Sequence, residues 1–259
     1  MTAPTTASTT LVAKLCRLLK LPTIAREAGR LAEESERQGQ SHLEYVQQLL
    51  AAEVEERGQR RAARRIREAG FPLVKTLAGF DFGRCPHLPE SRVRLLAEGG
   101  YLEKAEAVLL VGDPGTGKTH LATALGVAAA RQGRSVRFVT AGRLANELVE
   151  ARDAVALGRV VARYARVDLL VLDELGYLPL RATDAELLFQ VLSERTEQRA
   201  IIVTTNLPFS EWTSVFPEPR LCRAVVDRLT HRSTIIETGR KSIRLEEAMK
   251  RQPTPGGPA

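Results

Sequence analysis

The chain has 259 residues, 44% of them hydrophobic and 27% charged, with a formal net charge of +7. This balance is that of an ordinary globular protein, and at about 100–200 residues per domain the length allows one large or two modest domains. No apolar run approaches the roughly 18 residues of a membrane helix, and the N-terminus lacks the layout of a signal peptide. We therefore expect a cytoplasmic protein with no membrane partner.

Arginine outnumbers lysine by 31 to 7 among the 38 basic residues. Arginine is the better bidentate ligand for phosphate, but a high share of arginine also follows from genome base composition. The positions of the arginines therefore have to decide between the two explanations. The three cysteines and four histidines have neither CxxC nor metal-ligand spacing, so we expect no disulfide framework and no structural metal.

A small all-α domain is predicted over residues 11–70, after a Thr- and Ala-rich segment, residues 1–10, that we expect to be disordered. The apolar residues of this domain recur at helical spacing, and no alternating β-branched stretch occurs in it. Its predicted helices are a run ended by Pro22 with Leu11, Leu15, Leu18 and Leu19 on one face, residues 24–37, and a helix that starts near Ser41, capped with Glu44.

The helical pattern breaks at Gly70, and residues 71–85 are predicted to be a connector whose aromatic side chains pack on the next domain. Strands then alternate with helices, which predicts an α/β fold with a parallel sheet over residues 71–248. The tail, residues 249–259, is expected to be disordered. The predicted strands are 107–111, 135–139, 168–172 and 200–204, and the predicted helices are 118–132, two within 142–166, and 183–198.

The most specific motif is the glycine-rich sequence at 112–119, which matches the phosphate-binding loop G-x-x-x-x-G-K-[ST] in full. Glycines let backbone N–H groups surround a phosphate, and the following helix offers its positive N-terminus. Lys118 is expected to reach the β- and γ-phosphates of ATP, and the Thr119 hydroxyl to ligate Mg²⁺. The predicted nucleotide-binding residues are Gly112, Asp113, Pro114, Gly115, Thr116, Gly117, Lys118, Thr119 and His120.

Two carboxylates follow the apolar run 169–172, at the sheet edge where ligands bind in α/β proteins. We predict that Asp173 completes the Mg²⁺ site and that Glu174 orients or deprotonates an attacking water. Asn206, after the strand at 200–204, is predicted to position that water. The chain has neither an N-K-x-D guanine motif nor an L-S-G-G-Q signature, so ATP hydrolysis is favoured, with a metabolite kinase as the weaker alternative.

Together these residues resemble AAA+ ATPases of the helicase-loader and initiator branch, and more narrowly the IstB-like family of transposon ATP-binding helpers. The resemblance spans about residues 11–248, and its most specific strings are D-E-L-G-Y-L-P-L at 173–180 and P-F-S-E-W at 208–212. It implies a P-loop AAA+ parallel-sheet sandwich with a short or absent C-terminal lid. It also implies an ATPase whose site is completed by self-association.

In AAA+ proteins an arginine of one subunit contacts the γ-phosphate held by the next subunit. The resemblance places this arginine finger at Arg228, within the string D-R-L at 227–229, where it would act in trans. Arg223, earlier on the same predicted helix, is the second choice. Arg244 is a candidate second sensor that would act in cis.

Helical spacing groups eight further arginines into two stripes, which we predict to contact the backbone of duplex DNA without sequence readout. The alternative for each stripe is a solvated helix face. The chain is only 5% aromatic, which argues against stacking on single-stranded DNA. The first stripe is Arg57, Arg60, Arg61, Arg64 and Arg65, and the second is Arg159, Arg163 and Arg166.

The sequence as a whole predicts an ATP-dependent helper of DNA transposition in a bacterial-type cytoplasm. It would oligomerise on duplex DNA and recruit or stimulate a transposase, and ATP hydrolysis would control disassembly. Two alternatives stay open. One is a DnaC-type replicative helicase loader, and the other is a nucleotide-gated scaffold that does not hydrolyse ATP.

Overall fold

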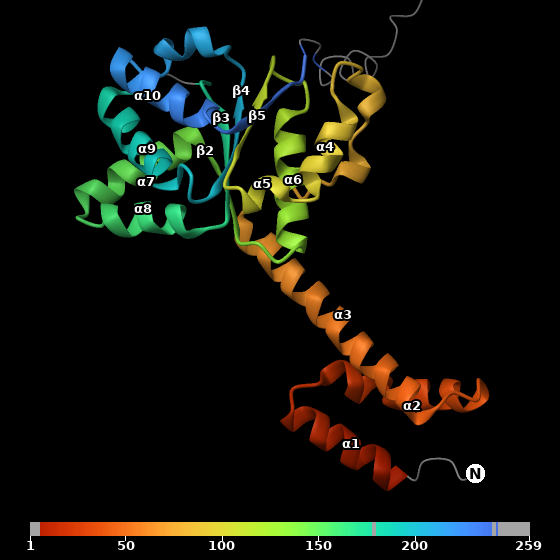
Figure 1. Ribbon diagram of the computed structural model, residues 1–259. Coiled ribbons are helices and arrows are strands. Elements are labelled where there is room, and N and C mark those ends of the chain that lie inside the picture. The colour runs from red at the N-terminus through yellow and green to blue at the C-terminus, as the bar shows by residue number, and fades with distance from the viewer. Residues whose placement is uncertain (1–5, 178–179, 240–241, 243–259) are drawn as a thin grey trace, which may run out of the picture. The chain divides into compact units, whose positions relative to one another are not determined.

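The computed structural model describes residues 6–177, 180–239 and 242, and the chain divides into two compact units, Met1–Ala63 and Arg64–Ala259. The N-terminal unit is helical and the C-terminal unit contains the sheet (Figure 1). The division falls within a long helix, α3 (His42–Ala69), a few residues before the predicted boundary at residue 70. The predicted tail, residues 249–259, lies outside the described residues. Over the part of the chain that is described, no helix is long and apolar enough to span a membrane.

The N-terminal unit contains α1 (Thr6–Leu18), α2 (Pro22–Arg37) and the first part of α3. Helix α1 begins inside the segment 1–10 that was predicted to be disordered. The predicted cap of α3 is confirmed, since the Ser41 hydroxyl accepts from the Glu44 N–H at 3.3 Å, and the Ser41 N–H donates to the Glu44 carboxylate at 2.7 Å. The four leucines that were predicted to share one face are exposed, and Leu19 lies just beyond the end of α1. The buried apolar core is Cys16, Ile24, Leu31 and Leu49.

A buried carboxylate connects two helices of this unit. Glu53 of α3 accepts hydrogen bonds from the N–H groups of Thr23 and Ile24, at 2.8 and 3.1 Å, in the first turn of α2. The Nε of Arg57 lies 2.8 Å from the other carboxylate oxygen. Burial disfavours the charged form, but Arg57 and the two N–H groups outweigh it and lower the pKa of Glu53.

The C-terminal unit is built on a five-stranded parallel sheet with the strand order β2-β3-β4-β1-β5. The three central strands are buried along most of their length, as the continuous apolar runs predicted. The strands are β1 (Ala107–Val111), β2 (Val136–Thr140), β3 (Leu169–Leu175), β4 (Ala200–Thr205) and β5 (Ser233–Glu237).

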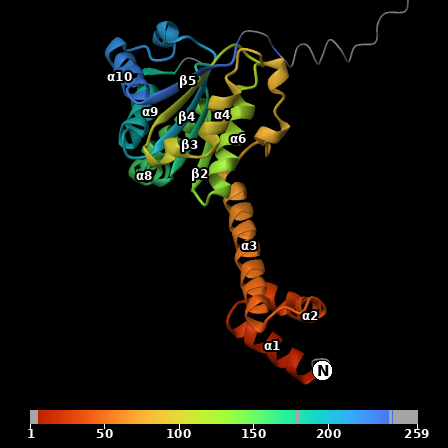
Figure 2. The same ribbon diagram turned by 45° about the vertical axis from the view of Figure 1, so that its right-hand side comes forward.

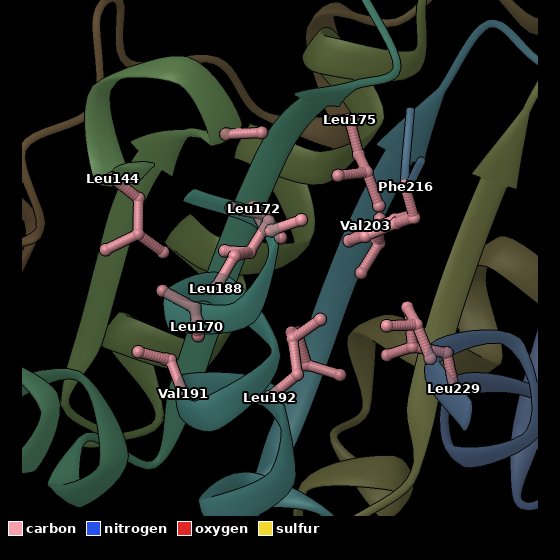
Figure 3. Packing of buried hydrophobic residues seen from close by; sticks show 14 of the residues in the cluster. Leu144, Leu170, Leu172, Leu175, Leu188, Val191, Leu192, Val203, Phe216 and Leu229 are labelled. Atoms are coloured by element: carbon pink, nitrogen blue, oxygen red, sulfur yellow. The ribbon is translucent and has the colours of Figure 1, made fainter. Parts of the chain in front are cut away.

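Helices cover both faces of this sheet, as Figures 1 and 2 show. Figure 3 shows the apolar core of one face, where α7, α9 and α10 pack leucine and valine side chains on β3 and β4. Short 3-10 turns, Leu77–Gly79, Phe82–Arg84 and Phe209–Ser214, connect these elements. One face carries α4 (Glu90–Ala97), α5 (Gly100–Glu103) and α6 (Lys118–Arg131), and the other carries α7 (Ala141–Asp153), α8 (Leu157–Arg166), α9 (Ala182–Arg195) and α10 (Pro219–Thr230).

The α/β fold class is confirmed. Helices α4 and α5 were not predicted, and β3 and β5 differ from the predicted strands. Strand β3 extends to Leu175, so Asp173 and Glu174 lie within the strand instead of after it. Strand β5 was not predicted, because it is short and only Ile236 in it is buried. It pairs with β1, which lies far away in the sequence.

We expect Glu53→Gln to destabilise the N-terminal unit by about 1–3 kcal/mol, because it removes the charge that Arg57 and two buried N–H groups compensate. The folded pKa is lowered, so the contribution is complete above the unfolded pKa of about 4.3 and is lost as the pH falls through the folded value. Hydrogen exchange of the α2 amides measures the loss at pH 7 and in acid. The exposed neighbour Glu55→Gln is the matched control. Equal exchange in both variants would contradict the assigned role.

Candidate functional site

The glycine-rich loop connects β1 to α6 at the carboxyl edge of the sheet. Gly115 and Gly117 adopt φ values of +85° and +93°, in the left-handed region that favours glycine. A Cβ at Gly117 would lie 2.8 Å from the ring of Phe80, so the loop has no room for a side chain there. Successive N–H groups in such a loop form an anion-binding concavity.

Side chains within the loop stabilise its shape. The Nζ of Lys118, at the start of α6, donates to the carbonyl oxygens of Gly112 and Asp113, the latter at 2.8 Å. Thr116 is buried, and its hydroxyl bonds the Asp113 carbonyl and the hydroxyl of Thr238 after β5. Thr116, one of the predicted nucleotide-binding residues, therefore stabilises the loop through internal hydrogen bonds and does not line the cavity.

Asp173 lies directly beneath the loop. The hydroxyl of Thr119 donates to both oxygens of this carboxylate at 3.1 Å, and the hydroxyl of Thr204 on β4 donates at 2.6 Å. Burial raises the pKa of Asp173, although both hydroxyls and the charge of Lys118 oppose the shift. Thr119 and Asp173 offer the hydroxyl and carboxylate oxygens that Mg²⁺ prefers, so the predicted metal ligands fit this ion.

Glu174 and Asn206 face the same space from neighbouring strands. Glu174 is exposed, has a φ of +60°, and donates its N–H to the hydroxyl of Thr204 at 2.9 Å. Asn206 directly follows β4, the neighbour of β3 in the sheet. Thr204 therefore holds both carboxylate residues of β3, a role that sequence reasoning missed.

A cavity of about 440 Å³ opens between the loop and these strand ends. His120 forms one wall, where its ring packs edge-on against Phe80 and its Nε2 lies 3.1 Å from the Thr76 carbonyl. Burial lowers the pKa of His120, which favours the neutral form of its ring. Four residues outside the predicted site also line the cavity, namely Lys75, Phe80, Arg84 and Tyr177. The predicted residues that line it are Pro114, Gly115, Gly117, Lys118, Thr119, His120, Glu174 and Asn206.

Residues 13–251 match the model of the IstB-like ATP binding protein family. The chain belongs to this family. A Sinorhizobium fredii insertion-sequence protein named for ATP binding is 38% identical over 93% of this chain and 81% of its own length. A Pseudomonas aeruginosa relative, named for insertion sequence IS21 and ATP binding, is 37% identical over 90% and 88%. The solved DnaC helicase loader is 25% identical with a TM-score of 0.50, over 57% of this chain and 86% of that one.

The predicted finger of this IstB-like chain, Arg228, does not line the cavity. It lies near the end of α10 and is exposed, as is Arg223 on the same helix. Its Nη1 donates to the Ser193 hydroxyl of α9 at 2.6 Å. Arg244 lies outside the described residues. Arg228 therefore lies outside the lining of the cavity between the glycine-rich loop and the strand ends.

The arginines of the stripe on α3 differ in their surroundings. Three of them pair with acids of the same helix, namely Arg57 with Glu53, Arg60 with Glu56 and Arg64 with Glu68. Among the residues that the structure describes, Arg61 and Arg65 form no ion pair. Only part of this stripe is therefore open to an external anion.

The stripe on α8 is interrupted in the same way. Arg163 pairs with Glu147 of α7, which also accepts a hydrogen bond from the Tyr164 hydroxyl. Arg159 and Arg166 are exposed, and neither forms an ion pair within the described ranges. Sequence spacing missed Glu147 because it lies on a different helix.

We expect Lys118→Ala to abolish ATP binding, because it removes the ammonium group that lies against the loop at Gly112 and Asp113 and neutralises the phosphates of ATP. Equilibrium binding of a fluorescent ATP analogue measures the loss, which should exceed about 100-fold, or 2.7 kcal/mol. Lys14→Ala, an exposed lysine of α1, is the control and should bind as the wild type does. Retained binding by Lys118→Ala would remove the cavity from consideration as the ATP site.

Proposed function

We propose that the protein is an ATP-dependent helper of DNA transposition. It binds ATP in the cavity, oligomerises on duplex DNA, and recruits or stimulates a transposase until hydrolysis dissolves the assembly. The observation that carries this proposal is the convergence of Lys118, Thr119, Glu174 and Asn206 on the lining of one cavity, with the buried Asp173 hydrogen-bonded to Thr119. The family relatives named for insertion sequences supply the transposition context.

Each residue at the cavity has a distinct task in the proposed hydrolysis. Lys118 neutralises charge on the β- and γ-phosphates. Thr119 and Asp173 would hold Mg²⁺, which offsets phosphate charge when it is bound. Glu174 accepts a proton from a water that Asn206 orients. The oxygen of this water bonds to the γ-phosphorus while the bond between the γ-phosphorus and the leaving oxygen of ADP breaks.

The position of Arg228 supports the proposed oligomerisation. A finger stabilises the charge that develops on the transferring phosphoryl group, and this requires contact with the γ-phosphate. Arg228 lies on α10, away from the cavity lining of its own chain. It therefore serves a neighbouring subunit in this proposal, and Arg223 is the second choice.

Duplex DNA is the proposed partner of the two arginine stripes, through contacts to phosphates. Arg61 and Arg65 on α3, and Arg159 and Arg166 on α8, are the members without acidic partners among the described residues. The proposal also includes the ion-paired arginines of the stripes, which contribute to the positive electrostatic potential. These are Arg57, Arg60, Arg64 and Arg163. The protein would act on DNA in a bacterial-type cytoplasm.

The helicase-loader alternative rests on fold likeness. The solved DnaC loader shares 25% of residues over 57% of this chain, whereas the insertion-sequence relatives share 37–38% over 90% or more. The transposition helper is therefore favoured.

We expect Glu174→Gln to bind ATP as the wild type does and to lower turnover by about 100-fold or more, because the amide cannot accept the proton of water. Its complexes with duplex DNA should persist when ATP is present. Phosphate release and DNA dissociation are measured with and without duplex DNA, and the exposed acid Glu186→Gln is the control. Normal turnover by Glu174→Gln would contradict its role, and no turnover by the wild type would favour the scaffold.

We expect Arg61→Glu/Arg65→Glu to weaken binding to all duplex sequences at least tenfold at low salt. The slope of log K against log salt should fall by about 2, for two lost phosphate contacts. The control is Arg26→Glu/Arg30→Glu on α2, which makes the same change of charge at exposed arginines outside the stripe. Fluorescence anisotropy at several salt concentrations measures both quantities.

The stripe on α8 is tested by the same change at Arg159 and Arg166. If neither pair of substitutions alters affinity or salt dependence beyond the α2 control, both stripes are solvated faces. Sequence-dependent losses would contradict the expected backbone binding.

A further inference from the structure

Arg228 is held by two side chains of α9. Its guanidinium carbon lies 4.5 Å from the ring centroid of Phe189, and its Nη1 lies 2.6 Å from the Ser193 hydroxyl oxygen. Phe189 and Ser193 are four residues apart in α9, so they lie on one face of this helix. We call these two residues the cradle.

The hydrogen bonds within the cradle have a fixed direction. The Ser193 hydroxyl donates its proton to the Phe189 carbonyl at 2.7 Å, so only its oxygen lone pairs face Arg228. The ring of Phe189 offers its negative face to the guanidinium. Both groups attract a cation, and neither carries a charge.

Several other exposed arginines of the chain have a different environment. Arg60, Arg163 and Arg181 each pair with a carboxylate, which fixes the side chain and neutralises its charge. Over the described ranges, Arg228 forms no ion pair. The cradle therefore orients the guanidinium and leaves its full charge for an external anion.

We propose that Phe189 and Ser193 are positioning residues for the arginine finger, which hold the Arg228 guanidinium ready for the γ-phosphate bound by the adjacent subunit. This inference rests on the proposed function. A preorganised cation stabilises developing phosphoryl charge without reorganising during the reaction. The cradle is neutral because a carboxylate at either position would compete with the phosphate for the same cation.

Subunit mixing tests the cradle on the donating side. Arg228→Ala subunits lack the finger but keep an intact cavity, and Glu174→Gln subunits bind ATP, do not turn over, and keep the finger. A mixture of the two should regain turnover in the Arg228→Ala sites. Donors that also carry Ser193→Ala or Phe189→Leu should restore a turnover that is lower by about fivefold or more, and the KM for ATP should stay unchanged.

Three further donors separate positioning from folding. Ser193→Thr keeps the hydroxyl and should restore turnover fully. Ser193→Asp keeps the arginine but pairs with it, and it should restore the least. Ser214→Ala removes a serine hydroxyl elsewhere, in the 3-10 helix Phe209–Ser214, that also donates to a backbone carbonyl, and it should have no effect. All donors should show the same thermal midpoint within about 3 °C, apart from a small loss for Phe189→Leu.

The outcomes distinguish the two levels of the proposal. No rescue of Arg228→Ala by plain Glu174→Gln donors would contradict the finger in trans. If the plain donors rescue turnover, and donors with Ser193→Ala, Ser193→Asp or Phe189→Leu rescue it equally well, the cradle alone would be overturned. Losses that Ser193→Thr shares with Ser193→Ala would also overturn it, because they would mark a packing defect.

Discussion

The carboxylate of Asp173 is buried at the edge of the sheet, where it accepts hydrogen bonds from Thr119 of α6 and Thr204 of β4. A buried charge is tolerated only where polar partners replace water. These two hydroxyls arrive together only when β3, β4 and the glycine-rich loop are in register. Thr204 also binds the N–H of Glu174, whose φ of +60° costs about 1–2 kcal/mol for a residue other than glycine. The geometry of the whole cavity therefore depends on this small network.

Local patterns predicted most of the C-terminal unit and most of its cavity. The glycine-rich loop and the apolar central strands are continuous in the sequence, so length and residue type indicated them. Thr204 and Ser193 were missed because their partners lie 30 or more residues away. No spacing rule detects a contact between two elements whose packing is unknown.

The N-terminal unit shows the same limit from the other side. Its helices and the cap at Ser41 follow from periodicity and residue type. Leu11, Leu15 and Leu18 were predicted to share one face of a helix, yet they are exposed on α1, and Cys16 is buried instead. The stripe on α3 was also too simple a description, because Arg57 compensates a buried carboxylate. Arginines at helical spacing thus have at least two roles in this chain, and only their interaction partners distinguish the roles.

The contact between Phe80 and Gly117 bears on how much of the chain a minimal fragment needs. The Phe80 ring fills the space where the loop lacks a Cβ, and it packs edge-on against Phe82 and His120. The predicted connector, residues 71–85, thus lies within the C-terminal unit and forms a wall of the cavity. A shortened protein that is to retain the shape of this cavity must begin before Lys75, although the glycine-rich loop itself starts only at Gly112.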